Sequence, residues 1–590
     1  MTATYQNATH QVTVPLGAGR RLPRWIFFRL LGLVYLIAFW SLWDQLGGLI
    51  GYDGIAPADR WLAHVQSAGH GAEPISWWKV PTLCWWLGAG EDTLNVLVCA
   101  GCGLSVGLIV GIWPRATLFG LWALYLSLFT VSAPFLNFQW DILLLETTVV
   151  AFFYAPTGLY PRVNHAREPS SVAIWLLRLL LFKLMLSSGI VKLLSGDQSW
   201  LDLTALDFHF WTQPIPHPLS WYAHHGGETA RQAGVLFNHF VELFVPWLII
   251  FNPRGLKCVI WFLACGGLLW LGYGEYTLVQ VAVAGVLAAV LGGRISPGQP
   301  DWSAGRTPAA CLIIVLMVSV ALSGNYGFFN LLTIALAMVC LDDASIYAFV
   351  PNRLLSRLPQ RESHTRPCGP ILHSVAILAA LLLVPLNGLQ LLDLASRQDR
   401  ATAQNAVRTG QADLIQTAMT WLVDARQSVH GVVGGFALVN SYGLFRTMTK
   451  TRPELLVEGS RDGQTWQRYR FKYKPSQQGD ALRFAGVHMP RLDWQMWFAA
   501  LYPRCSTRWF FGFLEALLEG SPSVRALLAE DPFADAPPRY LRVKRASAVF
   551  TTAAQRRDTG NAWRFEAGGE YCPIVDRARL SQIKTRRHRR

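Results

Sequence analysis

The feature that most constrains this chain is a succession of long apolar runs separated by short polar loops. A helix needs about twenty mainly apolar residues to cross a bilayer, and about eleven runs approach that length. With 52% hydrophobic and only 15% charged residues, the chain is too apolar for a soluble protein. We therefore expect a polytopic α-helical membrane domain over residues 25–391. The predicted spans lie near residues 25–48, 94–113, 116–135, 138–155, 172–194, 235–251, 257–272, 276–292, 308–324, 327–341 and 371–391.

The basic residues predict how the spans are oriented. Arginines are concentrated just before the first run, in the segment 1–24, whereas the long loop 51–93 carries only Arg60 and Lys79. Because cytoplasmic loops are enriched in Lys and Arg, the N-terminal segment is expected in the cytoplasm. An odd number of spans then places everything after residue 391 on the extracytoplasmic or lumenal side.

The formal net charge of +15 raises the question of an acidic partner. The basic residues lie in short loops and at the ends rather than along one polar face, so membrane lipids are favoured and nucleic acid is not expected. The basic tail, residues 576–590, is interpreted either as a solvated end or as a contact for anionic lipid.

The pattern changes after the last apolar run. Residues 392–430 are expected to form a polar helical linker, and residues 431–575 a mainly-β, β-sandwich-like domain with a helical insert. Asp462-Gly463 suits a tight hairpin between the first two strands. Cys505 and Cys572 fall in this domain, where a disulfide is possible but left open. Strand-like alternation occurs at 454–458, 467–473 and 539–550, and a helical period at 494–528.

Ionisable residues inside the predicted spans are candidate functional residues, because a charge in lipid is costly. Asp141 and Glu146 fall in the outer half of the fourth span, and Lys192 at the outer end of the fifth. Asp141 and Glu146 are five residues apart, too far around a helix to form one carboxylate pair. Other buried charges, such as Lys183, are interpreted equally well as partners in structural ion pairs.

Polar residues of two outer loops extend this region into a predicted outer-face site. Its histidines lack the spacing of a metal centre, so hydrogen bonding is favoured, and neither a metal nor a cofactor is expected. The predicted outer-face residues are Asp197, Trp200, Asp207, His209, Trp221, His224, Asn325 and Tyr326.

Several long motifs resemble the lipase maturation factor family. Near the fifth span, residues 185–209 read MLSSGIVKLLSGDQSWLDLTALDFH and are followed by Gln213-Pro-Ile-Pro. The resemblance covers nearly the whole chain. Further matching segments are residues 137–146, 324–332, 439–446, 452–460, 490–497 and 535–540.

The resemblance implies a polytopic protein that helps secreted lipases reach an active, assembled form through a lumenal, client-facing C-terminal domain. The partner implied is a secreted lipase or another exported protein. The composition, rich in Ala, Gly, Arg and Trp, favours a bacterial inner membrane over the endoplasmic reticulum. The predicted client-binding residues are Asn440, Tyr442, Arg446, Arg491, Asp493, Trp494 and Trp497.

A weaker resemblance supports an alternative function. Ser188-Gly-Ile-Val-Lys-Leu193 is similar to a segment of vitamin K-dependent gamma-carboxylase that holds a catalytic lysine, and Lys192 matches that position. The alternative is a membrane enzyme acting on a lipid, quinone or peptide, with Lys192 as base and Asp141 or Glu146 as the nearby carboxylate. An ion-paired or snorkelling lysine is the simpler interpretation, and the main hypothesis assigns no catalytic residue.

Overall fold

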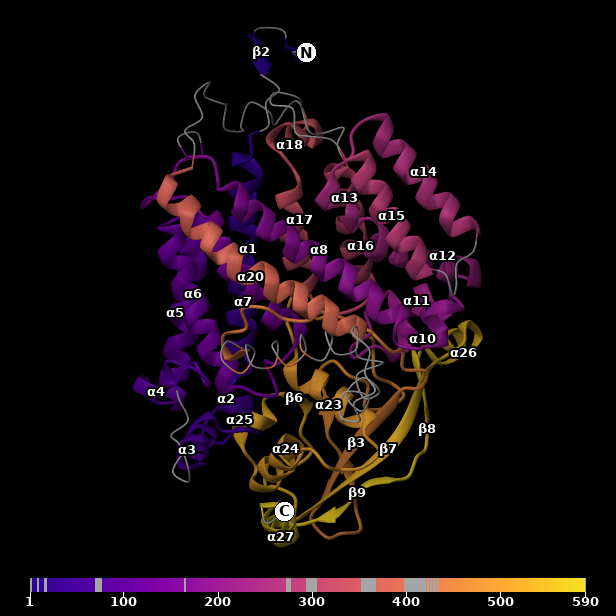
Figure 1. The fold of residues 1–590 in the computed structure, drawn as a ribbon. Helices are drawn as coiled ribbons and strands as arrows, with labels where there is room; N and C mark the ends of the chain where they lie inside the picture. The colour runs from indigo at the N-terminus through magenta and orange to yellow at the C-terminus, as the bar shows by residue number, and fades with distance from the viewer. Residues whose placement is uncertain are drawn as a thin grey trace, which may run out of the picture.

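The computed structural model consists of a helical bundle and a C-terminal domain, which covers the end of the bundle opposite the N-terminus (Figure 1). The termini therefore lie at opposite ends of the molecule. The structure describes all residues except 1–2, 8–9, 15–18, 69–76, 164–165, 272–276, 293–304, 352–367, 397–420, 422–423, 425–426, 428–430, 432–433 and 589–590.

Apolar helices build the bundle. Among the described residues, six helical stretches are long and apolar enough to cross a membrane, so the multi-pass membrane class is confirmed. The finer count of about eleven spans stays a prediction. The six are Arg21–Trp43 (α1), Glu91–Val110 (α5), Ser171–Leu193 (α8), Glu228–Phe251, Arg306–Ser323 (α16) and Pro370–Gln390 within α20 (Pro370–Ser396). The other bundle helices are α6 (Pro114–Val131), α7 (Gln139–Tyr154), α14 (Leu256–Leu271), α15 (Thr277–Leu291) and α17 (Phe329–Ala337), the last ending in η4 (Met338–Cys340).

The stretch Glu228–Phe251 is not one regular helix. It runs from α12 (Glu228–His239) through a π-helical turn, η2 (Phe240–Phe244), into α13 (Pro246–Phe251). Pro246 stands at the first position of α13, where a missing backbone N–H is tolerated.

Basic side chains gather at the end of the bundle that carries the N-terminus. Arg24 donates to the backbone oxygen of Arg167 at 2.7 Å, Arg21 pairs with Glu168, and Arg115 binds the carbonyl of Ala155. The same end holds α18 (Asp343–Phe349) and the hairpin of β1 (Ala3–Asn7) and β2 (His10–Val14).

Short helices cap the opposite end of the bundle, against the C-terminal domain. Their connecting loops bring polar side chains from distant parts of the chain to one face. These helices are α2 (Leu46–Ile50), α3 (Ala58–Ala68), α4 (Cys84–Leu87), α9 (Gln198–Leu201), α10 (Ala205–Thr212) and α11 (Ser220–His224).

An antiparallel sheet organises the C-terminal domain. Its order is β4-β3-β7-β8, with β9 also paired to β7, and the register sets Leu456 opposite Lys544. Strand β3 is buried along its whole length, as befits its central position. The strands are β3 (Pro453–Ser460), β4 (Gln467–Arg468), β7 (Tyr540–Phe550), β8 (Trp563–Glu566) and β9 (Glu570–Val575), with a separate pair of β5 (Arg470–Phe471) and β6 (Leu528–Glu530).

Helices inserted between β5 and β7 cover the sheet, which confirms the predicted helical insert. The predicted hairpin is also present: Gly463 has a φ of 78° and Asp462 accepts the N–H groups of Gln464 and Thr465, each at 2.8 Å. These backbone donors hold the pKa of Asp462 below its usual range. The helices of the domain are α23 (Arg491–Leu501), α24 (Arg508–Glu519), α25 (Pro522–Arg525), α26 (Ala553–Thr559) and α27 (Arg577–His588), preceded by the 3₁₀ turn η5 (Gly434–Phe436).

A disulfide joins Cys505, after α23, to Cys572 in β9. It therefore ties the helical insert to the sheet. The basic tail begins as α27, at the end of the domain farthest from the bundle (Figure 1). Most of the predicted linker, 392–430, lies outside the described residues, and its first five residues continue α20 to Ser396.

Candidate functional site

A buried ion pair ties the C-terminal domain to the bundle across a surface that we call the domain joint. Arg491, which begins α23, donates through its two terminal nitrogens to both oxygens of Asp141 in α7, at 2.6 and 2.8 Å. The two side chains are 1% and 0% exposed. Arg491 also donates to the carbonyl of Phe135, and the Tyr125 hydroxyl donates to Asp141 at 2.6 Å. Such a bidentate pair with further hydrogen bonds fixes both position and angle of the domain.

Glu146, also on α7, joins three parts of the chain. Its Oε1 accepts the Lys183 ammonium of α8 at 2.5 Å. Its Oε2 accepts the backbone N–H and side-chain amide of Asn440 at 3.1 and 3.0 Å and the Tyr442 hydroxyl at 2.6 Å. Asp141 and Glu146 thus serve separate cations, and both reach into the C-terminal part of the chain.

Lys192 is ion-paired rather than free. Its Nζ lies 2.5 Å from Oε2 of Glu242 in the π-helical turn, and 5.2 Å from the ring centre of Trp200. The alternative hypothesis places Asp141 or Glu146 beside Lys192. In the structure these two α7 carboxylates pair with Arg491 and Lys183.

The segment before β3 gathers several predicted outer-face residues. The indole N–H of Trp200 donates to the carbonyl of Phe445 at 3.2 Å, and Asp197 accepts the N–H of Met448 at 2.5 Å. The ring of His209 meets that of Phe445 edge-on, with centres 4.7 Å apart. Residues 445–448 are therefore held by the loop that follows α8.

His209 takes part in a chain of hydrogen bonds that sets its tautomer. The Tyr326 hydroxyl donates to Oε1 of Gln213 at 2.7 Å, so the same hydroxyl oxygen accepts from Nε2 of His209 at 3.1 Å. Burial, with a smaller contribution from nearby Lys192, lowers the pKa of His209 to about 4. The imidazole is therefore neutral near pH 7.

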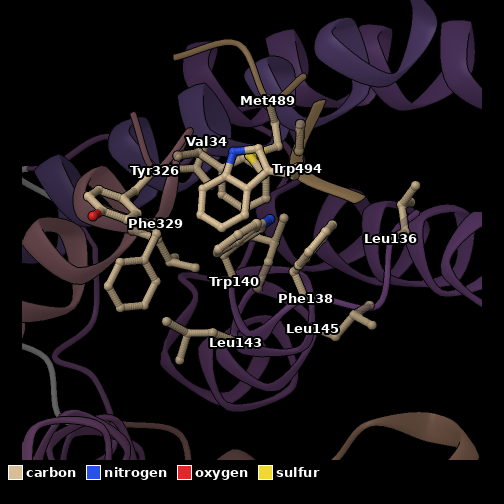
Figure 2. Close-up of a cluster of buried hydrophobic side chains, with 14 of the residues drawn as sticks. Val34, Leu136, Phe138, Trp140, Leu143, Leu145, Tyr326, Phe329, Met489 and Trp494 are labelled. Carbon is tan, nitrogen blue, oxygen red and sulfur yellow. The ribbon is translucent and has the colours of Figure 1, made fainter. Parts of the chain in front are cut away.

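Aromatic packing completes the joint. Figure 2 shows Trp494 and Met489 of the C-terminal domain lying against Trp140, Phe138 and Tyr326 of the membrane domain. The ring centres of Trp140 and Trp494 are 4.9 Å apart and those of Phe138 and Trp140 are 4.7 Å apart. All of these rings are buried, so the two domains share one hydrophobic core.

A second group of predicted outer-face residues lies beside β7 and α26. Asp207 pairs with Arg231 of α12, and Arg231 also donates to the carbonyl of His224 at 2.8 Å. Trp221 donates through its indole N–H to the carbonyl of Thr551 at 3.0 Å. The structure therefore splits the predicted outer-face site into two groups.

Two contacts across the joint were not predicted from the sequence. Arg452, fully buried, pairs with Glu454 and donates to the carbonyls of Trp211, Gln213 and Pro214. Gln45 accepts the N–H of Arg491 at 2.8 Å and donates to the carbonyl of Met489 at 2.9 Å. The sequence did offer a signal for the first contact, because Gln213 and Arg452 both lie in segments that resemble the family. Nothing in the sequence indicated Gln45.

Most of the predicted client-binding residues are internal to the joint. Tyr442, Arg491, Asp493, Trp494 and Trp497 are each at most 7% exposed. Asn440 is half-buried and Arg446 is exposed. Asp493 accepts the N–H groups of Tyr473 and Lys474 at 2.9 and 2.8 Å, and the indole N–H of Trp497 donates to the carbonyl of Thr212 at 2.8 Å.

The chemistry of the joint is that of satisfied charges. Asp141, Glu146 and Glu242 each hold a cation, an arrangement that suits a fixed interface. Within the described part of the chain, no group of three or more His, Cys, Asp or Glu side chains is placed to hold a metal ion. Fold and joint together define a class: a multi-pass membrane protein whose C-terminal domain is docked on one end of its bundle through buried ion pairs and shared aromatics.

Comparison with known proteins identifies the family within this class. The family model "Lipase maturation factor transmembrane domain" matches residues 22–293 and 300–348, and "Lipase maturation factor C-terminal domain" matches residues 438–573. Lipase maturation factor 2 of Gallus gallus is 32% identical over 95% of this chain and 82% of its own length. Lipase maturation factor 1 of Mus musculus is 29% identical over 95% of this chain and 88% of its own. No solved structure matches. The chain belongs to the lipase maturation factor family.

Removing Arg491 tests whether the joint depends on its ion pair. Arg491→Met leaves the Asp141 carboxylate buried without its cation, so the free energy of unfolding should fall by about 3–5 kcal/mol. Thermal unfolding and protease release of the C-terminal domain measure the change. Arg446→Met, at an exposed arginine, should stay within about 0.5 kcal/mol of wild type. Adding Asp141→Asn to Arg491→Met should recover part of the loss, and wild-type behaviour of Arg491→Met would contradict this assignment.

His209 makes stability at the joint depend on pH. Its pKa is about 4 in the folded protein and 6.5 ordinarily, so the unfolded chain binds the proton more tightly. The contribution is complete above pH 6.5 and is lost as the pH falls toward 4. Between pH 7 and pH 5 the free energy of unfolding should fall by about 1–2 kcal/mol through this group. His209→Asn, which cannot titrate, should show a shallower pH dependence; an unchanged slope would exclude this role.

Proposed function

We propose that this protein assists the folding or assembly of exported lipases, or of other exported proteins, on the face of the membrane that carries the C-terminal domain. The observation that carries the proposal is the family match, which covers both the membrane domain and the C-terminal domain. The names of its relatives describe factors for lipase maturation. A folding factor needs an accessible binding surface rather than a reactive centre.

The C-terminal domain is proposed to lie outside the cytoplasm. Two features support this orientation. The arginines Arg21, Arg24 and Arg115 lie at the opposite end of the bundle, as the positive-inside rule requires of a cytoplasmic face. The Cys505–Cys572 disulfide lies in the C-terminal domain, and disulfides persist in oxidising compartments such as the periplasm or the lumen of the endoplasmic reticulum. We favour a bacterial inner membrane on composition, and the same argument applies to either compartment.

We propose that the client meets the edge of the joint formed by residues 440–446. Arg446 is exposed there and Asn440 is half-buried. The buried members of the predicted client-binding set, such as Arg491 and Trp494, then act by fixing this edge on the bundle. Client recognition and domain docking are thus adjacent but use different side chains.

The enzyme hypothesis centred on Lys192 gains no support from the geometry. Lys192 is buried and lies 2.5 Å from the Glu242 carboxylate, so the structure places it in an ion pair between two neighbouring helical segments. The pair links α8 to the π-helical turn, which is a structural role.

A charge reversal at the client edge tests the proposed function. An exported lipase of the same organism is co-produced with wild type or with Arg446→Glu, and co-purified lipase and its activity are measured. The variant should lose lipase recovery several-fold at unchanged membrane protein level, because the exposed cation contacts the client. Arg557→Glu, at an exposed arginine on α26, is the matched control and should behave as wild type. Equal lipase activity with and without the wild-type protein would overturn the proposal.

A double substitution separates the assembly factor from the enzyme. Lys192→Met alone leaves the buried Glu242 carboxylate without its cation and should destabilise the fold. Lys192→Met combined with Glu242→Gln removes both charges and should leave the fold intact. An assembly factor should keep most of its effect on lipase activity in the double variant. Loss of function in the double variant, with wild-type thermal stability, would instead establish Lys192 as a reactive group.

A further inference from the structure

A loop of the C-terminal domain is fixed to the ends of two membrane helices. Residues 482–489 connect the β5 region to α23. Asn325, just beyond α16, accepts the N–H of Ala485 at 2.9 Å and donates to the carbonyl of Arg483 at 3.0 Å. At the other end of the loop, the N–H of Met489 donates to the hydroxyl of Ser41 on α1 at 2.8 Å.

Both attachment points lie where apolar helix surface ends. On α16, Val315, Val318 and Leu322 follow helical spacing along one exposed face, and Leu322 is three residues before Asn325. Asn325 is two residues beyond the end of α16 at Ser323, so it lies next to the end of that face. On α1, the exposed Trp40 is next to Ser41, and such tryptophans mark the boundary of the hydrocarbon.

Between these attachment points the loop exposes apolar side chains. Phe484 is 64% exposed and Val487 is 48% exposed, beside the exposed cation of Arg483. The ring of Phe484 contacts His217, with centres 4.9 Å apart. Close by, Leu219 is 45% exposed and extends the apolar surface.

We propose that Phe484 and Val487 insert into the boundary between lipid head groups and acyl chains, so that the C-terminal domain binds the membrane surface directly. The partner is phospholipid. The continuity of the loop with the lipid-facing side of α16 favours lipid over a protein partner, and Arg483 is placed to meet lipid phosphate. This contact does not depend on the proposed function, because it concerns where the domain rests and not what it binds.

Photocrosslinking in a bilayer tests the inference. The full chain is reconstituted in vesicles of phosphatidylcholine and phosphatidylglycerol with Phe484→benzoylphenylalanine, irradiated, and analysed by mass spectrometry. Trp40→benzoylphenylalanine is the positive control. Ile574→benzoylphenylalanine, at an exposed apolar side chain of β9, is the matched negative control. Lipid adducts at position 484 should approach the yield at position 40 and exceed that at position 574 several-fold.

A second probe guards against local misfolding. Val487→benzoylphenylalanine should also give lipid adducts, since it lies on the same loop. A yield at both positions no higher than at position 574 would overturn the inference. Adducts at both positions to protein alone would overturn it as well, and would identify the loop as a surface for a protein partner.

Discussion

The pairing of Asp141 with Arg491 is the constraint on which the rest of the joint depends. Both charges are shielded from water, so each is acceptable only in the presence of the other. The bidentate geometry fixes the direction of α23, and α23 carries Trp494 and Trp497 to their partners on the bundle. The aromatic core of the joint is therefore positioned by a polar contact.

Glu146 likewise fixes the segment before the sheet through a buried charge. One carboxylate accepts the Lys183 ammonium and three donors from Asn440 and Tyr442. A segment without regular secondary structure is ordered in this way, because its backbone and side chains satisfy a buried charge. Side chains also donate hydrogen bonds to backbone carbonyls at the joint, and Arg452 donates to three of them. Buried carbonyls that have no partner in a helix or sheet are satisfied in this way.

The sequence predicted those structural features that depend on residues close together in the chain. Apolar runs predicted the bundle helices, and Asp462-Gly463 predicted its hairpin. Arg24, near the start of the first apolar run, contacts Arg167 at the same end of the bundle. Partners could not be predicted, because Arg491 and Asp141 are 350 residues apart and only the folded chain brings them together. The sequence also could not predict which aromatic side chains are exposed. Trp494 and Trp497 were assigned to a binding surface as aromatic residues, but both are buried in the structure.

The long separation within the Asp141–Arg491 pair has a consequence for biosynthesis. The helix that carries Asp141 is made and inserted well before residue 491 emerges from the ribosome. Until then the carboxylates of Asp141 and Glu146 lack their C-terminal partners and must be hydrated or shielded by other means. The bundle is consequently finished only after the last domain has been translated and has docked, so a truncated chain leaves a membrane domain with unmet charges at one end.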